Sequence, residues 1–133
     1  NPALTAMHGD DAPQAILICP SNPYLSIDPI LAVPGIRAAL AAAPAPVVAI
    51  SPLIGGQAVK GPTDKIMGEL GMAATGSAIA DHYDDIIDGL IVDIRDPPQI
   101  ISVPSLRIDT LMQSLDDRMR VAEAALGFAD TLA

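Results

Sequence analysis

Three short apolar runs constrain the fold of this 133-residue chain more than any other feature. They are Ala15–Cys19 (AILIC), Val47–Ser51 (VVAIS) and Gly89–Asp93 (GLIVD). Each run is as long as a typical strand and lacks the alternating polar residues of a strand that has one face in water. Each is therefore predicted to be a strand buried on both faces, as in a parallel sheet that is covered by helices on both sides.

The segments between these runs complete an α/β pattern. Ser26–Ala43 is rich in Ala, Leu and Ile and is predicted to be a helix, with Pro34 in a first helical turn. Strand, helix and strand at this spacing form a βαβ unit, which requires parallel strands and a right-handed crossover. The other predicted elements are a loop over Pro52–Pro62, a helix over Thr63–Leu70 that stops at Gly71, a helix over Gly76–Tyr83 and a fourth strand over Ile100–Val103.

An amphipathic helix is predicted to close the chain. Asp109 or Thr110 would cap its first turn, because a short polar side chain can accept a hydrogen bond from a free amide there. Apolar residues then recur at steps of three and four, which is the spacing of one helix face. The face predicted to be buried consists of Leu111, Leu115, Met119, Ala122 and Leu126.

Charge and composition argue against several classes of function. The formal net charge is −9, whereas binding to the phosphates of nucleic acid depends on clusters of Lys and Arg. No run of about 18 apolar residues is present, so no membrane-spanning helix is expected. The single cysteine, Cys19, cannot form an internal disulfide, which is compatible with the cytoplasm. At the end of a strand, Cys19 is predicted to be a small core residue.

Two unusual loops follow the first two predicted strands. The first strand is followed by Pro20-Ser21-Asn22-Pro23, and the second by Ser51-Pro52 and then a glycine-rich stretch from Gly55 to Gly61. Ligands of open parallel sheets bind beyond the carboxyl ends of the strands. If the two strands are neighbours, both loops open at the same edge of the sheet. The sequence therefore predicts that they form the walls of one pocket.

The residue types in these loops indicate a phosphate ester as the ligand. Ser21, Asn22 and Ser26 offer neutral hydrogen-bond donors, and Ser26 lies where helix backbone amides could also face an anion. The pair Gly55-Gly56 would let the backbone approach a bulky group, and Lys60 would bring a positive charge to a phosphate. Neither the GxGxxG fingerprint nor the Walker pattern of phosphate-binding loops is present.

Each of these residues also has a simpler interpretation. Ser26 could be only the cap of a helix, and Lys60 could be a solvated surface lysine. His82, beside Tyr83 and four nearby aspartates, could belong to a metal site or lie on an acidic surface. The residues alone leave these alternatives open.

Three segments together resemble the 2-phospho-L-lactate transferases. They are PSNPYLSIDPILAVPGIRAAL, PVVAISPLIGGQAVKGPTDKIMGELG and ADHYDDIIDGLIVD, which follow one another in order between Ala15 and Asp93. The resemblance implies a Rossmann-like parallel sheet with flanking helices, the use of magnesium, and a homodimer or larger assembly. It also implies which residues lie near the nucleotide and its phosphates: Ser21, Asn22, Pro23 and Ser26 at the first strand end, and Gly55, Gly56, Lys60, Gly61 and Pro62 in the glycine-lysine loop. His82 and Tyr83 match the family's His-Tyr pair, without an assigned role.

The resemblance further implies a reaction. In this family a phospholactyl-type group passes from a guanosine diphospho-activated, GTP-derived donor to the deazaflavin Fo, GMP is released, and the product is the precursor of coenzyme F-420. Members of the family are more than twice as long as this chain, and their glycine-rich start and metal-associated aspartates lie upstream. Residues 1–133 are therefore expected to be a single α/β domain that forms the C-terminal portion of such a transferase, with the Mg²⁺ ligands in the missing N-terminal part, and to be inactive alone.

Two other interpretations of the chain are kept. The stretch YLSIDPILAVPGI also resembles the gluconeogenesis-factor family of regulatory, nucleotide-sugar-binding proteins, whereas SPLIGGQAVKGPT favours the transferase. A purely structural fragment without ligand affinity is the third interpretation.

Overall fold

A four-stranded parallel sheet forms the centre of the computed structural model, which describes residues 1–58 and 61–133. The strands are β1 (Ile16–Ile18), β2 (Val47–Ile50), β5 (Gly89–Asp93) and β6 (Ser105–Ile108), and they lie side by side in that order. Ile16 pairs with Val47, Val48 with Gly89, and Leu90 with Ser105, all in parallel register. The predicted α/β fold, with a Rossmann-like parallel sheet and flanking helices, is confirmed.

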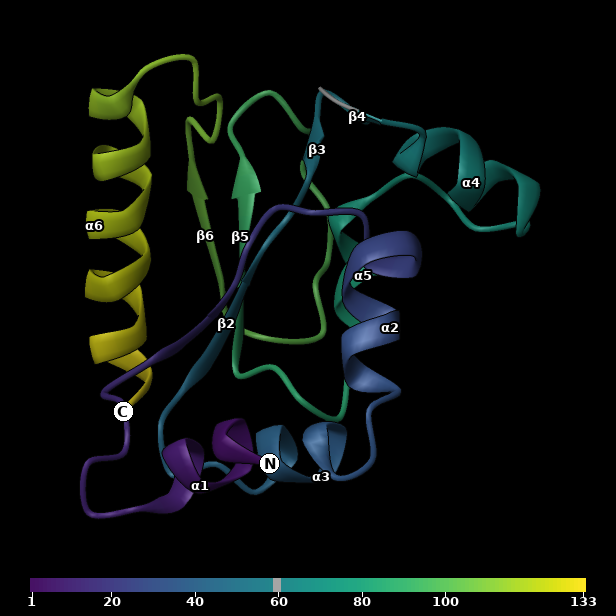
Figure 1. Ribbon diagram of the computed structural model, residues 1–133. Helices are drawn as coiled ribbons and strands as arrows, with labels where there is room; N and C mark the ends of the chain where they lie inside the picture. Colours follow the sequence, from purple (N-terminus) through teal and green to yellow (C-terminus); the bar gives the residue numbers. More distant parts are fainter. Residues whose placement is uncertain (59–60) are drawn as a thin grey trace.

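Helices cover both faces of the sheet, which explains why its central strands are apolar throughout (Figure 1). Val47 and Ala49 face one hydrophobic core, whereas Val48 and Ile50 face the other. The first core is covered by α2 (Asp28–Leu31), α3 (Ile36–Ala41) and α5 (Gly76–His82), and the second by the long helix α6 (Leu115–Leu132). The remaining helices are α1 (Pro2–His8) and α4 (Thr63–Glu69).

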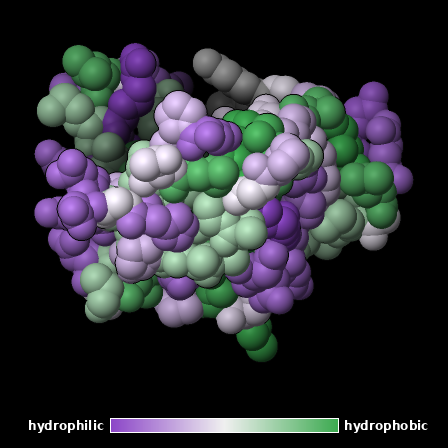
Figure 2. Space-filling view, turned by 60° about the horizontal axis from the view of Figure 1, so that its bottom comes forward, coloured by the Kyte–Doolittle hydropathy of each residue, from purple (hydrophilic) through white to green (hydrophobic). Residues whose placement is uncertain are grey.

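The surface at the amino-terminal end of the strands is the lower end of the molecule in Figure 1, where α1 and α3 lie. Hydrophilic and hydrophobic residues are interspersed over this end (Figure 2). None of the helices in the described part of the chain combines the length and the apolarity needed to cross a bilayer.

The connection between β1 and β2 differs from the single predicted helix over Ser26–Ala43. It begins with a five-residue π-helix, η1 (Pro23–Ile27), continues directly into α2, and breaks before α3. Gly35 precedes α3 with a φ of 88°, a conformation that favours glycine, so Pro34 lies in the break and not in a first helical turn. Single π-turns of this kind are often found at functional sites.

Three further predictions about local structure were wrong. The stretch predicted as a loop over Pro52–Pro62 contains a small antiparallel hairpin, β3 (Leu53–Ile54) and β4 (Gln57–Ala58). The fourth strand is not at Ile100–Val103 but at Ser105–Ile108, because Pro104 closes an irregular segment before the strand begins. Cys19 is exposed and not a core residue, since β1 ends one residue earlier.

The closing helix exists, but its start and its buried face differ from the prediction. Ser114 caps α6 by accepting a hydrogen bond from the amide of Asp117, in place of Asp109 or Thr110. The face against the sheet consists of Val121, Ala125 and Ala129. Leu111 of the predicted face lies before the helix and is half-buried, and the other four residues point outward: Leu115, Met119 and Leu126 are 65%, 52% and 50% exposed, and Ala122 is exposed as well.

Candidate functional site

A pocket of about 490 Å³ lies beyond the carboxyl ends of β1, β2 and β6. Its first wall comes from residues 20–26, its second wall from Ser51, Pro52, Ile54, Gly61 and Pro62, and its third wall from residues 110–112. The residues that line it are Pro20, Ser21, Asn22, Leu25, Ser26, Ser51, Pro52, Ile54, Gly61, Pro62, Thr110, Leu111 and Met112. The two loops singled out in the sequence therefore meet at one pocket, as predicted.

Asn22 organises the first wall. Its side-chain Oδ1 accepts hydrogen bonds from the amides of Tyr24, at 2.9 Å, and Leu25, at 3.1 Å, and so caps η1. Its carbonyl oxygen accepts from the amides of Ser26, at 3.0 Å, and Ile27, at 3.2 Å. The side-chain Nδ2 of Asn22 is buried and has no hydrogen-bond partner among the described residues. Asn22 lines the pocket, so this unpaired donor belongs to a residue of the pocket wall.

The other predicted residues of the first loop have different surroundings. Ser21 and Ser26 line the pocket, whereas Pro23 is buried as the first residue of η1. Ser26 is exposed, and it is not the helix cap, because Asn22 has that role. The simpler interpretation of Ser26, as only the cap of a helix, is therefore wrong.

The glycine pair of the second loop forms the turn of the hairpin and does not line the pocket. Gly55 and Gly56 have φ values of 61° and 79°, which are left-handed conformations suited to glycine in a tight hairpin turn. The amide of Gly56 donates to Oδ1 of Asp96 at 3.3 Å. Burial of Asp96 raises its pKa, against the opposing effect of the hydrogen bonds from both glycines. The pair thus shapes the loop that continues to Gly61 and Pro62 in the pocket wall.

Lys60, the predicted positive charge of this loop, lies outside the described residues. Its neighbour Gly61 lines the pocket and has a φ of 75°. The role of Lys60 stays a prediction.

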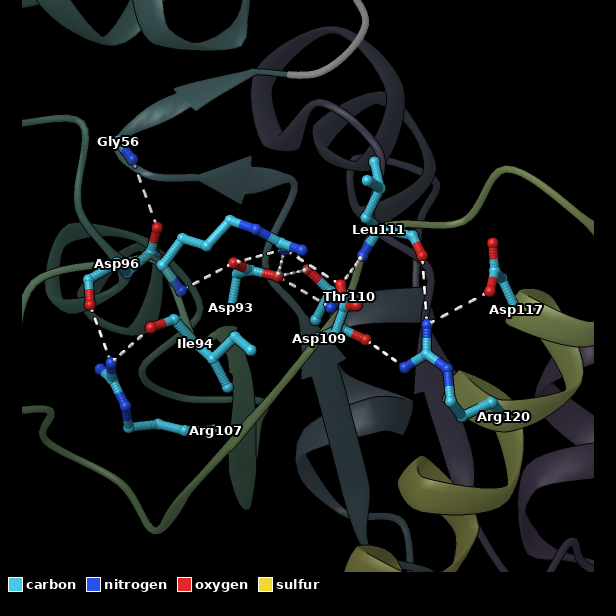
Figure 3. A network of polar contacts seen from close by, with 11 residues as sticks. Gly56, Asp93, Ile94, Asp96, Arg107, Asp109, Thr110, Leu111, Asp117 and Arg120 are labelled. Atoms are coloured by element: carbon cyan, nitrogen blue, oxygen red, sulfur yellow. Dashed lines mark hydrogen bonds and ion pairs between the residues drawn. The ribbon is translucent and has the colours of Figure 1, made fainter.

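The third wall was not found from the sequence, and a buried carboxylate holds it (Figure 3). Asp93, the last residue of β5, accepts hydrogen bonds on Oδ2 from the amide of Thr110, at 2.8 Å, and from its hydroxyl, at 3.0 Å. Its Oδ1 accepts from the amide of Arg95 at 2.8 Å, and the Arg95 guanidinium contacts both carboxylate oxygens. Burial alone would raise the pKa of Asp93, but these hydrogen bonds outweigh it and lower the pKa.

Helix α6 holds the same wall from the other side. The guanidinium of Arg120 donates to the carbonyl oxygens of Asp109 and Leu111, and it lies 3.7 Å from the carboxylate of Asp117 (Figure 3). The backbone around Thr110 is thus fixed by β5 and by α6 together. The sequence signal for this wall was Asp93, an aspartate at the end of an apolar strand. Because the fourth strand was predicted at Ile100–Val103, the segment after β6 was not recognised as part of the same sheet edge.

His82 and Tyr83 lie away from the pocket lining. Nε2 of His82 is 2.7 Å from Oδ1 of Asp28, which begins α2. Tyr83 is buried in the first core, and burial raises its pKa. In the part of the chain that the structure describes, no group of three or more His, Cys, Asp or Glu side chains is placed to hold a metal ion. The described residues therefore do not fit a magnesium site.

The described walls are chemically suited to binding. They combine neutral donors, such as Asn22 and the serine hydroxyls, with apolar side chains from Leu25, Ile54, Leu111 and Met112. The lining residues in the described ranges include no carboxylate, histidine or cysteine that would serve as a general base or a nucleophile. This arrangement can position a ligand that has polar and apolar parts.

The chain is similar to known proteins along most of its length. Residues 1–125 match the family model described as 2-phospho-L-lactate transferase CofD. The chain is 46% identical over 121 residues to a phosphoenolpyruvate transferase of Kitasatospora aureofaciens, an alignment that covers 86% of this chain and 38% of the relative. It is 37% identical over 134 residues to a 2-phospho-L-lactate transferase of Methanosarcina barkeri, covering 97% of this chain and 42% of the relative.

A similar match is found with a phosphoenolpyruvate transferase of Streptomyces coelicolor, at 37% identity over 135 residues, 97% of this chain and 42% of the relative. The chain thus spans about two fifths of the length of the curated relatives that it matches. The family model covers nearly the whole chain, including all three walls of the pocket. The chain belongs to the 2-phospho-L-lactate transferase CofD family.

Proposed function

We propose that this chain provides the phosphate-binding pocket of a cytoplasmic transferase of coenzyme F-420 biosynthesis. The donor is a guanosine diphospho-activated three-carbon acid, the acceptor is the deazaflavin Fo, and GMP is the leaving group. The observation that carries the proposal is the buried Nδ2 of Asn22, a donor without a partner in the described residues, in a pocket at the carboxyl edge of a parallel sheet. Family membership supports the choice of reaction.

The names of the relatives bear on the transferred group. One set is named phosphoenolpyruvate transferase and another 2-phospho-L-lactate transferase, and both align with this chain at similar identity. These names share a three-carbon acid with a phosphate ester. We therefore propose that class of donor.

The proposed reaction is a substitution at phosphorus. A ribityl hydroxyl of Fo forms a bond to the phosphorus of the transferred group, the bond from that phosphorus to the GMP oxygen breaks, and the hydroxyl proton is lost. Residues of this chain act by positioning the donor: Asn22 and the serines of the first wall donate hydrogen bonds to phosphate oxygens, and Lys60 contributes charge. The proposed magnesium ion has its ligands outside the present chain, as does the general base.

Loss of the Lys60 charge is expected to weaken binding of GDP. We expect Lys60→Ala to reduce the binding free energy by about 1–3 kcal/mol, the range for hydrogen bonds to charged groups. Calorimetric titration of the purified chain with GDP measures this difference. A separate expectation is that the chain alone is inactive: when guanylated donor, Fo and magnesium are supplied, it should bind the donor but release no GMP.

The matched control is Lys65→Ala, which removes an exposed lysine of α4 that does not line the pocket. It should leave the affinity for GDP within about twofold of the unmodified chain. Equal affinities for Lys60→Ala and Lys65→Ala would return Lys60 to the class of solvated surface lysines. Absence of any GDP binding by the unmodified chain would contradict the proposed function itself.

A further inference from the structure

His82 contacts the segment that contains the first wall at two residues that do not line the pocket, Tyr24 in the wall and Asp28 just after it. Its Nε2 is 2.7 Å from Oδ1 of Asp28, and because a carboxylate only accepts hydrogen bonds, this nitrogen donates. Its ring lies 4.8 Å, between centroids, from the ring of Tyr24. The Tyr24 hydroxyl in turn lies 2.9 Å from the sulfur of Met72. One side of η1 and the start of α2 are thus held by His82.

The other side of the same segment lines the pocket. Asn22, Leu25 and Ser26 are lining residues, whereas Tyr24 and Asp28 are not. The turn that connects these residues is closed by backbone bonds: the amides of Ser26 and Ile27 donate to the carbonyl of Asn22, and the amide of Asp28 donates to the carbonyl of Pro23. A shift of Tyr24 or Asp28 would therefore move the residues that face a ligand.

The helix that carries His82 is fixed on the sheet. A Cβ atom at Gly76, the first residue of α5, would come within 2.7 Å of a methyl of Val92, so the helix and strand β5 are in close contact. Ile79 and Ala80 of the helix are fully buried, and Tyr83 follows in the core. His82 is the last residue of this rigid element and is itself only partly exposed, with 21% of its side chain accessible.

We propose that His82 is a positioning residue, which acts through Asp28 and Tyr24 to hold the first wall so that Asn22 and Ser26 face a phosphate-bearing ligand. The hydrogen bond to Asp28 fixes the junction of η1 and α2, and the contact with Tyr24 fixes the turn above it. The identity of the ligand rests on the proposed function, whereas the ordering of the wall does not.

Hydrogen exchange of the purified chain tests the ordering of the wall directly. In His82→Leu, the amides of Ser26, Ile27 and Asp28 should exchange about tenfold faster, because the wall opens locally more often. His82→Gln retains a side-chain N–H donor and should restore exchange to within about threefold of the unmodified chain. Asp28→Ala removes the acceptor without altering α5 and should accelerate the same amides. The double variant His82→Leu/Asp28→Ala should then show no further acceleration over His82→Leu, because that variant has already lost the contact with Asp28.

Arg37→Gln is the matched control. The Arg37 guanidinium on α3 pairs with Asp85, just beyond α5, so this ion pair also ties the connection between β1 and β2 to the α5 region, but it does not touch the first wall. Its loss should leave the exchange of the three amides within about twofold. Equal exchange rates in His82→Leu, Asp28→Ala and the unmodified chain would overturn the proposal.

Titration with GDP gives the functional readout. The Kd of His82→Leu should rise five- to tenfold, that of His82→Gln at most threefold, and that of Arg37→Gln should not change. If the unmodified chain fails to bind GDP, the proposed function is wrong, and the exchange rates still decide whether His82 orders the wall. Faster exchange with an unaltered Kd would overturn the positioning role while leaving the GDP site intact. If His82→Leu does not fold, Asp28→Ala and His82→Gln provide the same comparison.

Discussion

Replacing Asp93 by alanine is expected to lower the free energy of unfolding by about 3–5 kcal/mol, the range for breaking a buried charged network by removing one partner. The carboxylate is fully buried and accepts from the amide and hydroxyl of Thr110 and from Arg95. Without it, the buried amide and hydroxyl of Thr110 are left unpaired in the interior, and each costs about 1–3 kcal/mol when it cannot reach water. Chemical denaturation at pH 7 measures the loss.

Asp109→Asn is the control for this experiment. Asp109 also pairs with Arg95, at 3.0 Å, but it is exposed, and an asparagine oxygen can still accept the hydrogen bond from the amide of Leu111. Its cost should be much smaller than that of Asp93→Ala, as for other surface ion pairs. Equal costs for the two substitutions would show that burial of Asp93 does not matter.

The same residue predicts a dependence of stability on pH. The pKa of Asp93 is lowered in the folded chain, so its charged form contributes stability above the ordinary carboxyl pKa of about 4. This contribution is lost as the pH falls through the lowered folded pKa. The unmodified chain should therefore lose stability more steeply as the pH falls below about 4 than Asp93→Ala, in which the group is absent.

Asn22→Asp is expected to weaken GDP binding by at least 100-fold. Aspartate caps a helix as well as asparagine does, so the hydrogen bonds from the amides of Tyr24 and Leu25 should be retained. The change replaces the free Nδ2 donor by a carboxylate oxygen that faces phosphate. Loss of a hydrogen bond to a charged group and the new like-charge contact together cost about 3–4 kcal/mol, or more than 100-fold in Kd.

Calorimetric titration, with denaturation as the check on folding, measures this effect. Asn22→Ala is an informative companion, because it removes the cap and the donor without adding a charge. It should bind GDP more weakly than the unmodified chain but more tightly than Asn22→Asp. An affinity for Asn22→Asp equal to that of the unmodified chain would show that Nδ2 does not face the ligand.

The sequence contained enough information to place the strands of the sheet centre but not the buried face of the last helix. The runs of β2 and β5 are apolar at successive positions, so both faces of each strand must be buried. The burial of these strands could therefore be predicted from their residue types alone. In α6 the spacing of the large apolar residues was found, but Met119 and the buried Val121 are two positions apart, about 200° around a helix.

Side-chain size explains why a different face of α6 is buried from the one predicted. The sheet accepts α6 closely, since a Cβ at Gly89 would lie 2.7 Å from Leu132 and 2.8 Å from Phe128. Small residues such as Ala125 and Ala129 suit this distance, whereas the larger Leu126 stays outside. Such a choice depends on the partner surface, which no local pattern in the helix records.

The candidate site shows the same division between local and long-range information. The rule for parallel sheets was sufficient to bring the loops after β1 and β2 to one pocket. The glycine pair of the second loop correctly indicated an unusual backbone conformation, but the pair forms a hairpin turn and not a ligand contact. Asp96, 40 residues further along the chain, accepts a hydrogen bond from the amide of Gly56 in this turn. The third wall depended on the position of β6 and on the contact of Asp93 with Thr110, which joins residues 17 positions apart.

The three walls of the pocket come from segments that are far apart along the chain, and this has a thermodynamic consequence. A ligand that touches all three walls at once can do so only in the folded state. It therefore acts as a reversible cross-link between the carboxyl ends of three strands. At 100 times its Kd such a ligand adds about 2.7 kcal/mol, which for a domain of this size raises the melting temperature on the order of 10 °C. Melting curves with GDP, GMP and simple phosphates would rank the ligands of this pocket without any assay of turnover, and equal melting temperatures throughout would show that none of them bridges the walls.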